Sequence, residues 1–347
     1  QLLGIAVPYF QKLQREGESG RRKINQITRY LTLAILIPQG LSYITSLRYQ
    51  LPAEAFSPTF SRMAAMVILT AGTMFIMWLG ERITDKGIGN GISLIIFAGI
   101  VAQLPSAIAS TLELGRTGAL NTLFILFLII LVIATITFIV FIERAQRRII
   151  VQYPKRQVGQ RMFGGENTHM PLKLNTAGVI PPIFASSLLL LPVTVASFSA
   201  QGGPEWLTTV TSLLGRGQPL YLALYIGGIV FFCFFYTAIV FNPADTADNL
   251  KKYRGFIPGI RPGKRTAEYL DYVLTRLTVV GAGYLALVCL LPELLMSQYA
   301  VPFYFGGTSL LIVVSVTMDT VSQIQSHLLA HQYEGLIKKS KLRGRNK

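Results

Sequence analysis

Long apolar runs alternate with short polar segments along almost the whole chain. A helix of about 20 consecutive apolar residues is long enough to cross a hydrocarbon layer of about 30 Å, and each run is close to that length. The runs lie at approximately 30–47, 63–80, 91–109, 121–142, 177–198, 219–241, 274–292 and 306–327. This pattern predicts an all-α polytopic membrane protein with eight complete transmembrane helices.

The composition supports this interpretation. Of the 347 residues, 51% are hydrophobic and only 14% are charged, whereas a soluble domain carries about 25% charged residues. A large soluble helical protein is therefore a poor alternative. Cys233 and Cys289 each lie inside an apolar run, so we interpret them as reduced packing residues rather than as members of a disulfide framework.

Lysine and arginine alternate between the two sides of the predicted membrane. Of nine polar segments, counting both tails, one alternate set carries 28 of the 32 Lys and Arg residues and the other set carries 4. The positive-inside rule places the richer set in the cytoplasm. The alternation supports the count of eight helices, because one missed or surplus helix would scramble it. It also explains the net charge of +16 without nucleic acid.

Two cytoplasmic segments, 143–176 and 242–276, are longer than 25 residues. Loops of that length usually carry function or are disordered. The first contains Tyr153 and Phe163 among its charges, and the second contains Tyr253 and a run of Gly and Pro turn residues. We therefore expect both segments to be ordered.

The middle of each predicted span lacks ionisable residues, and Glu143 and Asp319 fall at or toward cytoplasmic ends. Ion-coupled transporters usually need buried charges to bind the driving ion. A passage closed by an apolar constriction needs none, because it gates by excluding water. A passive channel is thus favoured over a small-solute secondary transporter and over a membrane enzyme, for which no catalytic constellation is evident.

Several short motifs carry little chemistry. The glycine-rich segment 87–91 lacks the βαβ context of a dinucleotide site and is better explained as a tight turn where two helices meet closely. The chain also lacks a phosphate-binding P-loop, so any energy for work must come from elsewhere. His327 and His331 are four residues apart but lack a third ligand, which favours interfacial polar residues over a metal site. We expect no metal and no cofactor.

Two apolar features have alternative explanations. Ile92 and Ile96 share one face of a helix and could form part of a constriction, although such a pair usually faces lipid or a neighbouring helix. The aromatic run 231–236 is most simply a lipid-facing surface, and a lateral opening for apolar segments would have the same composition.

Stretches spread along the whole chain resemble, in the same order, the bacterial SecY family, the channel subunits of the Sec translocon. They include 17–26 (GESGRRKINQ), 72–75 with 78–81, 87–93 (GIGNGIS), 143–148 (ERAQRR), 168–173 (THMPLK), 177–181 (AGVIP), 242–243 with 247–252, 259–263 (GIRPG) and 301–309 (VPFYFGGTS). The resemblance implies a passive channel of the bacterial cytoplasmic membrane. It conducts unfolded secretory proteins and releases apolar segments sideways into lipid.

The resemblance also implies ten helices in two inverted halves. Residues 1–112 would be the remainder of the N-terminal half, containing the end of the second helix and the third to fifth helices. Residues 113–347 would be the C-terminal half, with the sixth to tenth helices and a basic cytoplasmic tail. Because the chain opens with an apolar segment followed by Pro8, we expect the protein to extend upstream. The resemblance implies that this upstream part holds a first helix and a plug.

Site residues follow from the matching motifs. The family's pore ring corresponds to Ile92, Ile96, Ile183 and Ile312. Its lateral gate corresponds to Ile183, Ser187 and Leu191, with Leu191 standing where other members place an aromatic residue.

The two long basic loops resemble the family's docking surface for the ribosome and the motor ATPase SecA. The matching residues are Lys155, Arg156, Arg161, Lys251, Lys252, Arg254, Arg261 and Lys264. Arg261 matches a functionally critical arginine and suits phosphate binding, although it could instead only order its loop. Gln160 replaces the second Arg of a usual pair. Further implied partners are SecE, SecG, signal sequences, nascent chains and membrane lipid.

Overall fold

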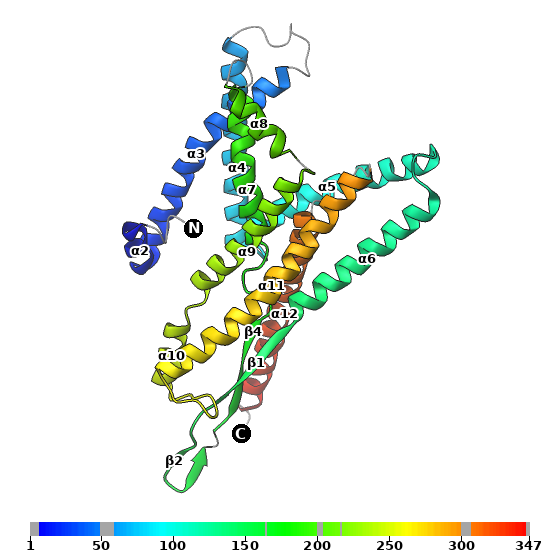
Figure 1. Cartoon of the computed structure of the whole chain (residues 1–347). Coiled ribbons are helices and arrows are strands. Elements are labelled where there is room, and N and C mark those ends of the chain that lie inside the picture. Colours follow the sequence, from blue (N-terminus) through cyan, green and yellow to red (C-terminus); the bar gives the residue numbers. More distant parts are fainter. Residues whose placement is uncertain are drawn as a thin grey trace. The chain divides into compact units, whose positions relative to one another are not determined.

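The computed structural model describes residues 7–48, 59–163, 165–199, 204–215, 217–299 and 307–344. Helices dominate these residues, and each of the eight predicted segments coincides, apart from its ends, with one long helix (Figure 1). These helices are α3 (Glu18–Arg48), α4 (Thr59–Lys86), α5 (Gly91–Arg116), α6 (Thr122–Arg144), α7 (Ile180–Ser199), α9 (Pro219–Val240), α11 (Lys264–Gln298) and α12 (Gly307–Gly344).

Five segments of the described chain are long and apolar enough to cross a membrane. They are Phe60–Lys86, Gly91–Arg116, Thr122–Arg144, Pro219–Lys252 and Lys264–Gln298. A shorter apolar helical stretch lies at Ile180–Pro192 in α7. The predicted all-α polytopic architecture is therefore confirmed.

The beginning of α7 differs from the prediction. The helix starts at Ile180 rather than near residue 177, because Gly178 has a φ of +67° and interrupts the helical backbone. Pro181 and Pro182 then occupy its first turn, where a missing backbone N–H costs no hydrogen bond.

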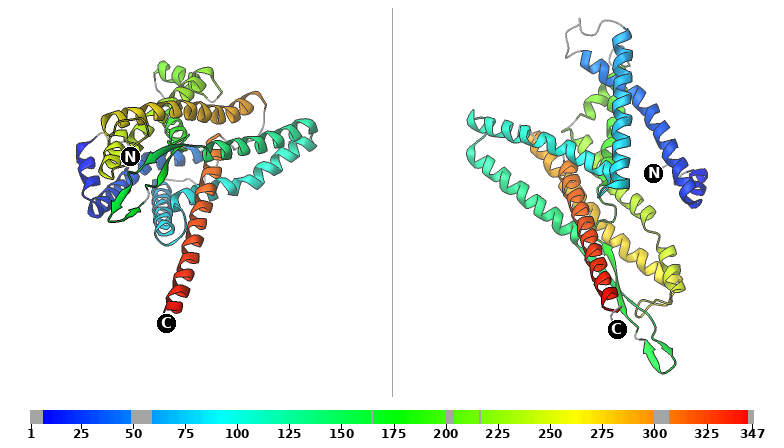
Figure 2. Two further views of the ribbon diagram at one scale, coloured as in Figure 1. Left: turned by 90° about the horizontal axis from the view of Figure 1, so that it is seen from below. Right: turned by 180° about the vertical axis from the view of Figure 1, so that it is seen from behind.

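Two helices are longer than predicted. Helix α11 continues through Pro292 to Gln298, so Glu293, predicted to lie outside the span, is inside the helix and only 9% exposed. Helix α12 continues past the predicted end at residue 327 to Gly344. Residues 321–340 of α12 are exposed, and Figure 2 shows this helix running beyond the helices against which it packs.

The chain forms two compact units, Gln1–Gly87 and Ile88–Lys347. In the first, α2 (Pro8–Arg15) packs against α3, and α3 packs against α4. The small residue Gly40 allows a close approach, since a Cβ there would lie 2.8 Å from the sulfur of Met66. Arg29 of α3 and Glu81 of α4 form an ion pair.

The core of the second unit lies where α9 packs against α7 on one side and against α11 on another (Figure 1). Ile229, Cys233, Leu285 and Cys289 are almost completely buried there. Both cysteines are free thiols, as predicted. A short helix, α8 (Glu205–Leu213), connects α7 to α9.

The first long basic loop forms strands, which the sequence analysis did not anticipate. Strand β1 (Gln146–Gln152) pairs antiparallel with β4 (Asn167–Lys173), and at the tip β2 (Arg156–Val158) pairs with β3 (Arg161–Phe163). Ile149 and Val151 alternate with exposed residues along β1, as expected for a strand with one covered face.

The second basic loop packs onto the first. It begins with α10 (Pro243–Lys252), which Asn242 caps by accepting a hydrogen bond from the backbone of Ala244 at 3.1 Å. Beyond α10, Phe256 and Gln152 exchange two backbone hydrogen bonds of 2.9 and 3.0 Å. Ile149, Leu172, Ile257, Leu270 and Val273 form a small core between the loops and the start of α11.

The two loops are therefore one structural unit rather than two independent segments. We call residues 145–174 together with 242–263 the basic module. The prediction that both loops are ordered is confirmed.

Helix α11 passes the connection between β4 and α7 without a side chain in between. A Cβ on Gly281 would lie 2.9 Å from the carbonyl oxygen of Leu174, whereas a Cβ on Gly283 would have no neighbour within 4 Å. We predict that Gly281→Ala lowers the free energy of unfolding by about 1–3 kcal/mol through overpacking. Thermal unfolding of the purified protein, with Gly283→Ala as the matched control, measures this effect. Equal midpoints for the two variants would contradict it.

Candidate functional site

The four predicted pore-ring residues lie on three helices of the second unit. Ile92 and Ile96 are near the start of α5, Ile183 is in the first turn of α7, and Ile312 is near the start of α12. Their side chains are 55%, 45% and 37% exposed for the first three, and that of Ile312 is half-buried. The packed core of the unit therefore covers these four side chains only in part.

Helix α5 is anchored to α12 through the glycine-rich turn. Gly89, with a φ of +86°, donates its backbone N–H to Oε1 of Gln323 at 2.7 Å. A Cβ on Gly89 would lie 3.4 Å from the hydroxyl of Thr320, so the turn itself lies against α12. The sequence analysis did not identify Gln323, since an exposed glutamine on a long helix has no motif around it.

The three predicted lateral-gate residues follow one another along α7 at intervals of four. The hydroxyls of Ser186 and Ser187 both donate to the carbonyl of Ile183, at 2.9 and 2.8 Å. Ser187 is exposed and Leu191 is 60% exposed. This face of α7 is thus outside the packed core.

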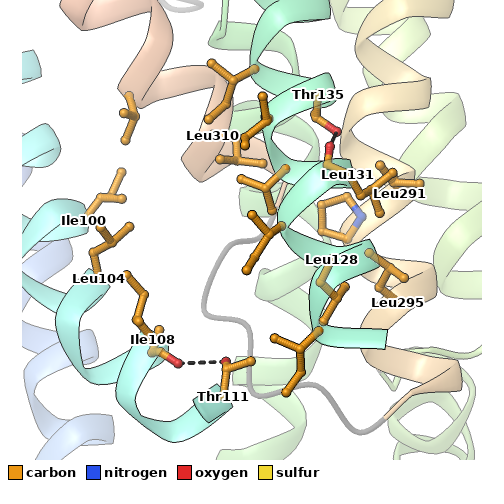
Figure 3. Close-up of a pocket in the computed structure, with 18 of the residues that line it drawn as sticks. Ile100, Leu104, Ile108, Thr111, Leu128, Leu131, Thr135, Leu291, Leu295 and Leu310 are labelled. Atoms are coloured by element: carbon orange, nitrogen blue, oxygen red, sulfur yellow. Dashed lines mark hydrogen bonds between the residues drawn. The ribbon is translucent and has the colours of Figure 1, made fainter. Parts of the chain in front are cut away.

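An apolar cavity of about 440 Å³ lies between α5, α6, α11 and α12 (Figure 3). Side chains such as Ile100, Leu104, Leu128 and Leu291 form most of its lining. The two labelled threonines do not offer polar groups to a solute, because Thr111 and Thr135 donate their hydroxyls to the carbonyls of Ala107 and Leu131. Such a lining does not suit a polar solute or an ion.

A second hollow, of about 460 Å³, lies between α7, α8 and α9. Its lining includes the hydroxyl-bearing residues Ser186, Ser187, Thr211 and Tyr221. Sequence reasoning identified neither hollow, because the packing of helices against one another is not visible in the sequence pattern.

The predicted docking residues lie on the basic module and at the start of α11. Six of them have described side chains, and all six are exposed: Lys155, Lys251, Lys252, Arg254, Arg261 and Lys264. Arg156 and Arg161 belong to β2 and β3 at the hairpin tip, and their side chains lie outside the described residues. The module therefore presents a strongly positive surface.

The backbone of Arg261 is held by a threonine in the first turn of α11. The buried Thr266 donates its hydroxyl to the carbonyl of Arg261 at 2.9 Å. This contact orders the loop through main-chain atoms and leaves the guanidinium group exposed. Arg254 has a φ of +57°, a left-handed conformation that is uncommon for a residue with a side chain.

A polar cluster joins several elements of the second unit near the base of the hairpin. Asn175 donates its amide to Glu143 at 3.0 Å, and the hydroxyl of Tyr284 donates to the same carboxylate oxygen at 3.4 Å. The sequence analysis placed Glu143 at the end of its helix but did not identify either partner. Nothing in the local sequence links residues so far apart.

The two histidines of α12, His327 and His331, are exposed. Across the part of the chain that the structure describes, no group of three or more His, Cys, Asp or Glu side chains is arranged to hold a metal ion.

Comparisons with known proteins identify the family. The SecY family model matches residues 1–321. The protein translocase subunit SecY of Escherichia coli K12 is 55% identical over 99% of this chain and 79% of its own length. The corresponding subunits of Vibrio cholerae and Rickettsia typhi are 54% and 52% identical over the same share of the chain.

Solved structures show the same fold. One is a SecY structure from work on how the plug domain stabilises the closed channel; it has a TM-score of 0.64 and 17% identity, and the match covers 94% of this chain and 78% of that one. Another, described as a protein conducting channel, has a TM-score of 0.62 and 17% identity over 88% of this chain and 74% of that one. From the family match and the relatives together, this chain belongs to the SecY family, and it is a multi-pass protein of the bacterial inner membrane and not an enzyme.

Proposed function

We propose that this chain forms the passage through which unfolded secretory proteins cross the membrane, and from which apolar segments leave sideways into lipid. The observation that carries this proposal is more than half identity to translocase subunits over 99% of the chain. The apolar helices and the apolar cavity support a passive conduit. The small-solute transporter considered from the sequence finds no support among these relatives.

We propose Ile92, Ile96, Ile183 and Ile312 as the constriction of this passage. Three helices of one compact unit supply them, and none of the four is fully buried. Apolar side chains at a narrow point exclude water and ions without binding a translocating chain tightly.

Sideways release is assigned to α7, at Ile183, Ser187 and Leu191. Their exposure on one helix supports this assignment, since a gate helix must separate from its neighbour without unpacking the core. The helix keeps its own packing through its opposite side, where Ala185 is buried against Gly228 of α9.

The division into two inverted halves, 1–112 and 113–347, is also part of this proposal. It rests on the resemblance to the family. The boundary between the compact units falls elsewhere in the sequence, between residues 87 and 88, because α5 packs against α12 of the second unit.

We further propose SecA and the ribosome as the partners that dock on the basic module, with SecE and SecG as companion subunits. The relatives are named as subunits of a translocase, and the exposed cations of the module suit acidic proteins and RNA phosphates. The absence of a P-loop from the sequence supports an external energy source.

The role of Arg261 can be tested by charge reversal. We predict that Arg261→Glu lowers the rate of preprotein translocation about tenfold or more, because a charge-assisted contact to a partner is lost. Arg265→Glu is the matched control, since it makes the same change at an exposed position four residues away. Translocation into vesicles, compared at equal amounts of inserted protein, gives the measurement. Equal rates for the two variants would refute a specific role.

The constriction can be tested by ion leak. We predict that Ile92→Gly with Ile96→Gly raises the resting conductance of the channel in planar bilayers, because a wider apolar ring admits water. The control is Leu126→Gly with Ile130→Gly, a pair on α6 with the same spacing and similar exposure that does not line the apolar cavity. A leak that is unchanged in the first pair, or equal in both pairs, would remove the isoleucines from the ring.

A further inference from the structure

The connection between the hairpin and α7 is short and firmly held. It comprises residues 174–179, and Asn175 and Ala177 are only 4% and 2% exposed. Leu174 extends the hairpin pairing by donating its backbone N–H to the carbonyl of Ala145 at 3.2 Å. The segment that leads into the predicted gate helix is thus a continuation of the basic module.

The side-chain amide of Asn175 bridges two helices. Its Nδ2 donates to Glu143 in the last turn of α6 at 3.0 Å and to the carbonyl of Gly178 at 3.2 Å. Gly178 lies two residues before α7, and its φ of +67° sets the direction of the chain at this point. One buried amide therefore links the end of α6 to the segment just before α7.

Helix α11 completes the arrangement. Tyr284 donates its hydroxyl to Glu143 at 3.4 Å, and Gly281 brings the α11 backbone against Leu174 and Asn175. The glycine leaves no room for the connection to shift toward α11. The ends of β4 and α6, the start of α7 and the middle of α11 therefore meet at Asn175.

We propose that Asn175 is a positioning residue that fixes the start of α7 relative to the basic module. The inference rests on the proposed function, which assigns Ile183 to the constriction and α7 to the gate. Ile183 lies in the first turn of α7, so any shift or rotation of the helix start carries it along. The basic module and the gate helix then move together, and loss of the Asn175 amide lets the start of α7 move independently of the module.

The proposal can be tested by measuring the distance between the hairpin and α7. The two native cysteines are buried, so spin labels can be placed on introduced cysteines at exposed positions: Ile150→Cys in β1, Leu188→Cys in α7 and Leu287→Cys in α11. Pulsed EPR on the full chain in its native complex then gives two distance distributions, one from hairpin to α7 and one from hairpin to α11.

Asn175→Ala should broaden the hairpin-to-α7 distribution and leave the hairpin-to-α11 distribution narrow. Because two buried hydrogen bonds are lost, the fraction of molecules in which the start of α7 is displaced should rise about tenfold or more. The resting ion conductance should rise with it. Thr176→Ala is the matched control, because the Thr176 hydroxyl contacts only the carbonyl of Lys173 within the same connection.

Three results would overturn the proposal. Two are distributions and conductance equal to those of the control, and equal broadening of both distances together with a lower melting temperature. The third is an unchanged hairpin-to-α7 distribution in Glu143→Ala, which removes one acceptor of the Asn175 amide and serves if Asn175→Ala fails to assemble. Since the distances are measured without transport, a failure of the proposed function would appear separately, as absent preprotein translocation by the unsubstituted chain.

Discussion

The hydrogen-bonding demand of the backbone in lipid is the constraint from which the rest of this structure follows. A peptide group in hydrocarbon has no water to bond, so a segment that crosses must satisfy its own N–H and C=O groups as a helix. The apolar segments of this chain obey that rule throughout the described residues. Strands occur in the long basic loop, where water and neighbouring strands can complete the pairing.

The same constraint explains where polar side chains gather. Inside the helices, serine and threonine hydroxyls bond back to carbonyls of the preceding turn, as Thr111 and Thr135 do beside the apolar cavity. Several polar contacts between distant elements have one partner close to the end of a helix. Glu143 with Asn175, and Gly89 with Gln323, are two such contacts. Helix ends therefore supply polar contacts between elements, whereas the apolar middle parts of the helices remain available to line the proposed passage.

Two kinds of surface result, and they suit the family's activity. Membrane helices with exposed apolar side chains can line a route or face lipid without binding a polar cargo. The basic module concentrates exposed cations on two loops that share a small core with the start of α11. In the proposed function, this surface holds the partner that supplies the driving force.

The sequence alone determined the membrane class and the eight helical segments, because apolar length acts locally along the chain; the side that faces the cytoplasm stays a prediction from Lys/Arg placement. Family motifs supplied the pore, gate and docking residues, which remain predictions. The sequence did not reveal the strands of the hairpin, because their alternation of apolar and polar residues is short and lies among charged residues. It also predicted that the helix α11 ends before the buried Glu293. Only the tertiary structure decided that the two basic loops form one module and that Asn175 joins β4, α6, α7 and α11. In the same cluster, the hydrogen bond from Tyr284 to Glu143 links residues 141 positions apart, and local patterns carry no information at that range.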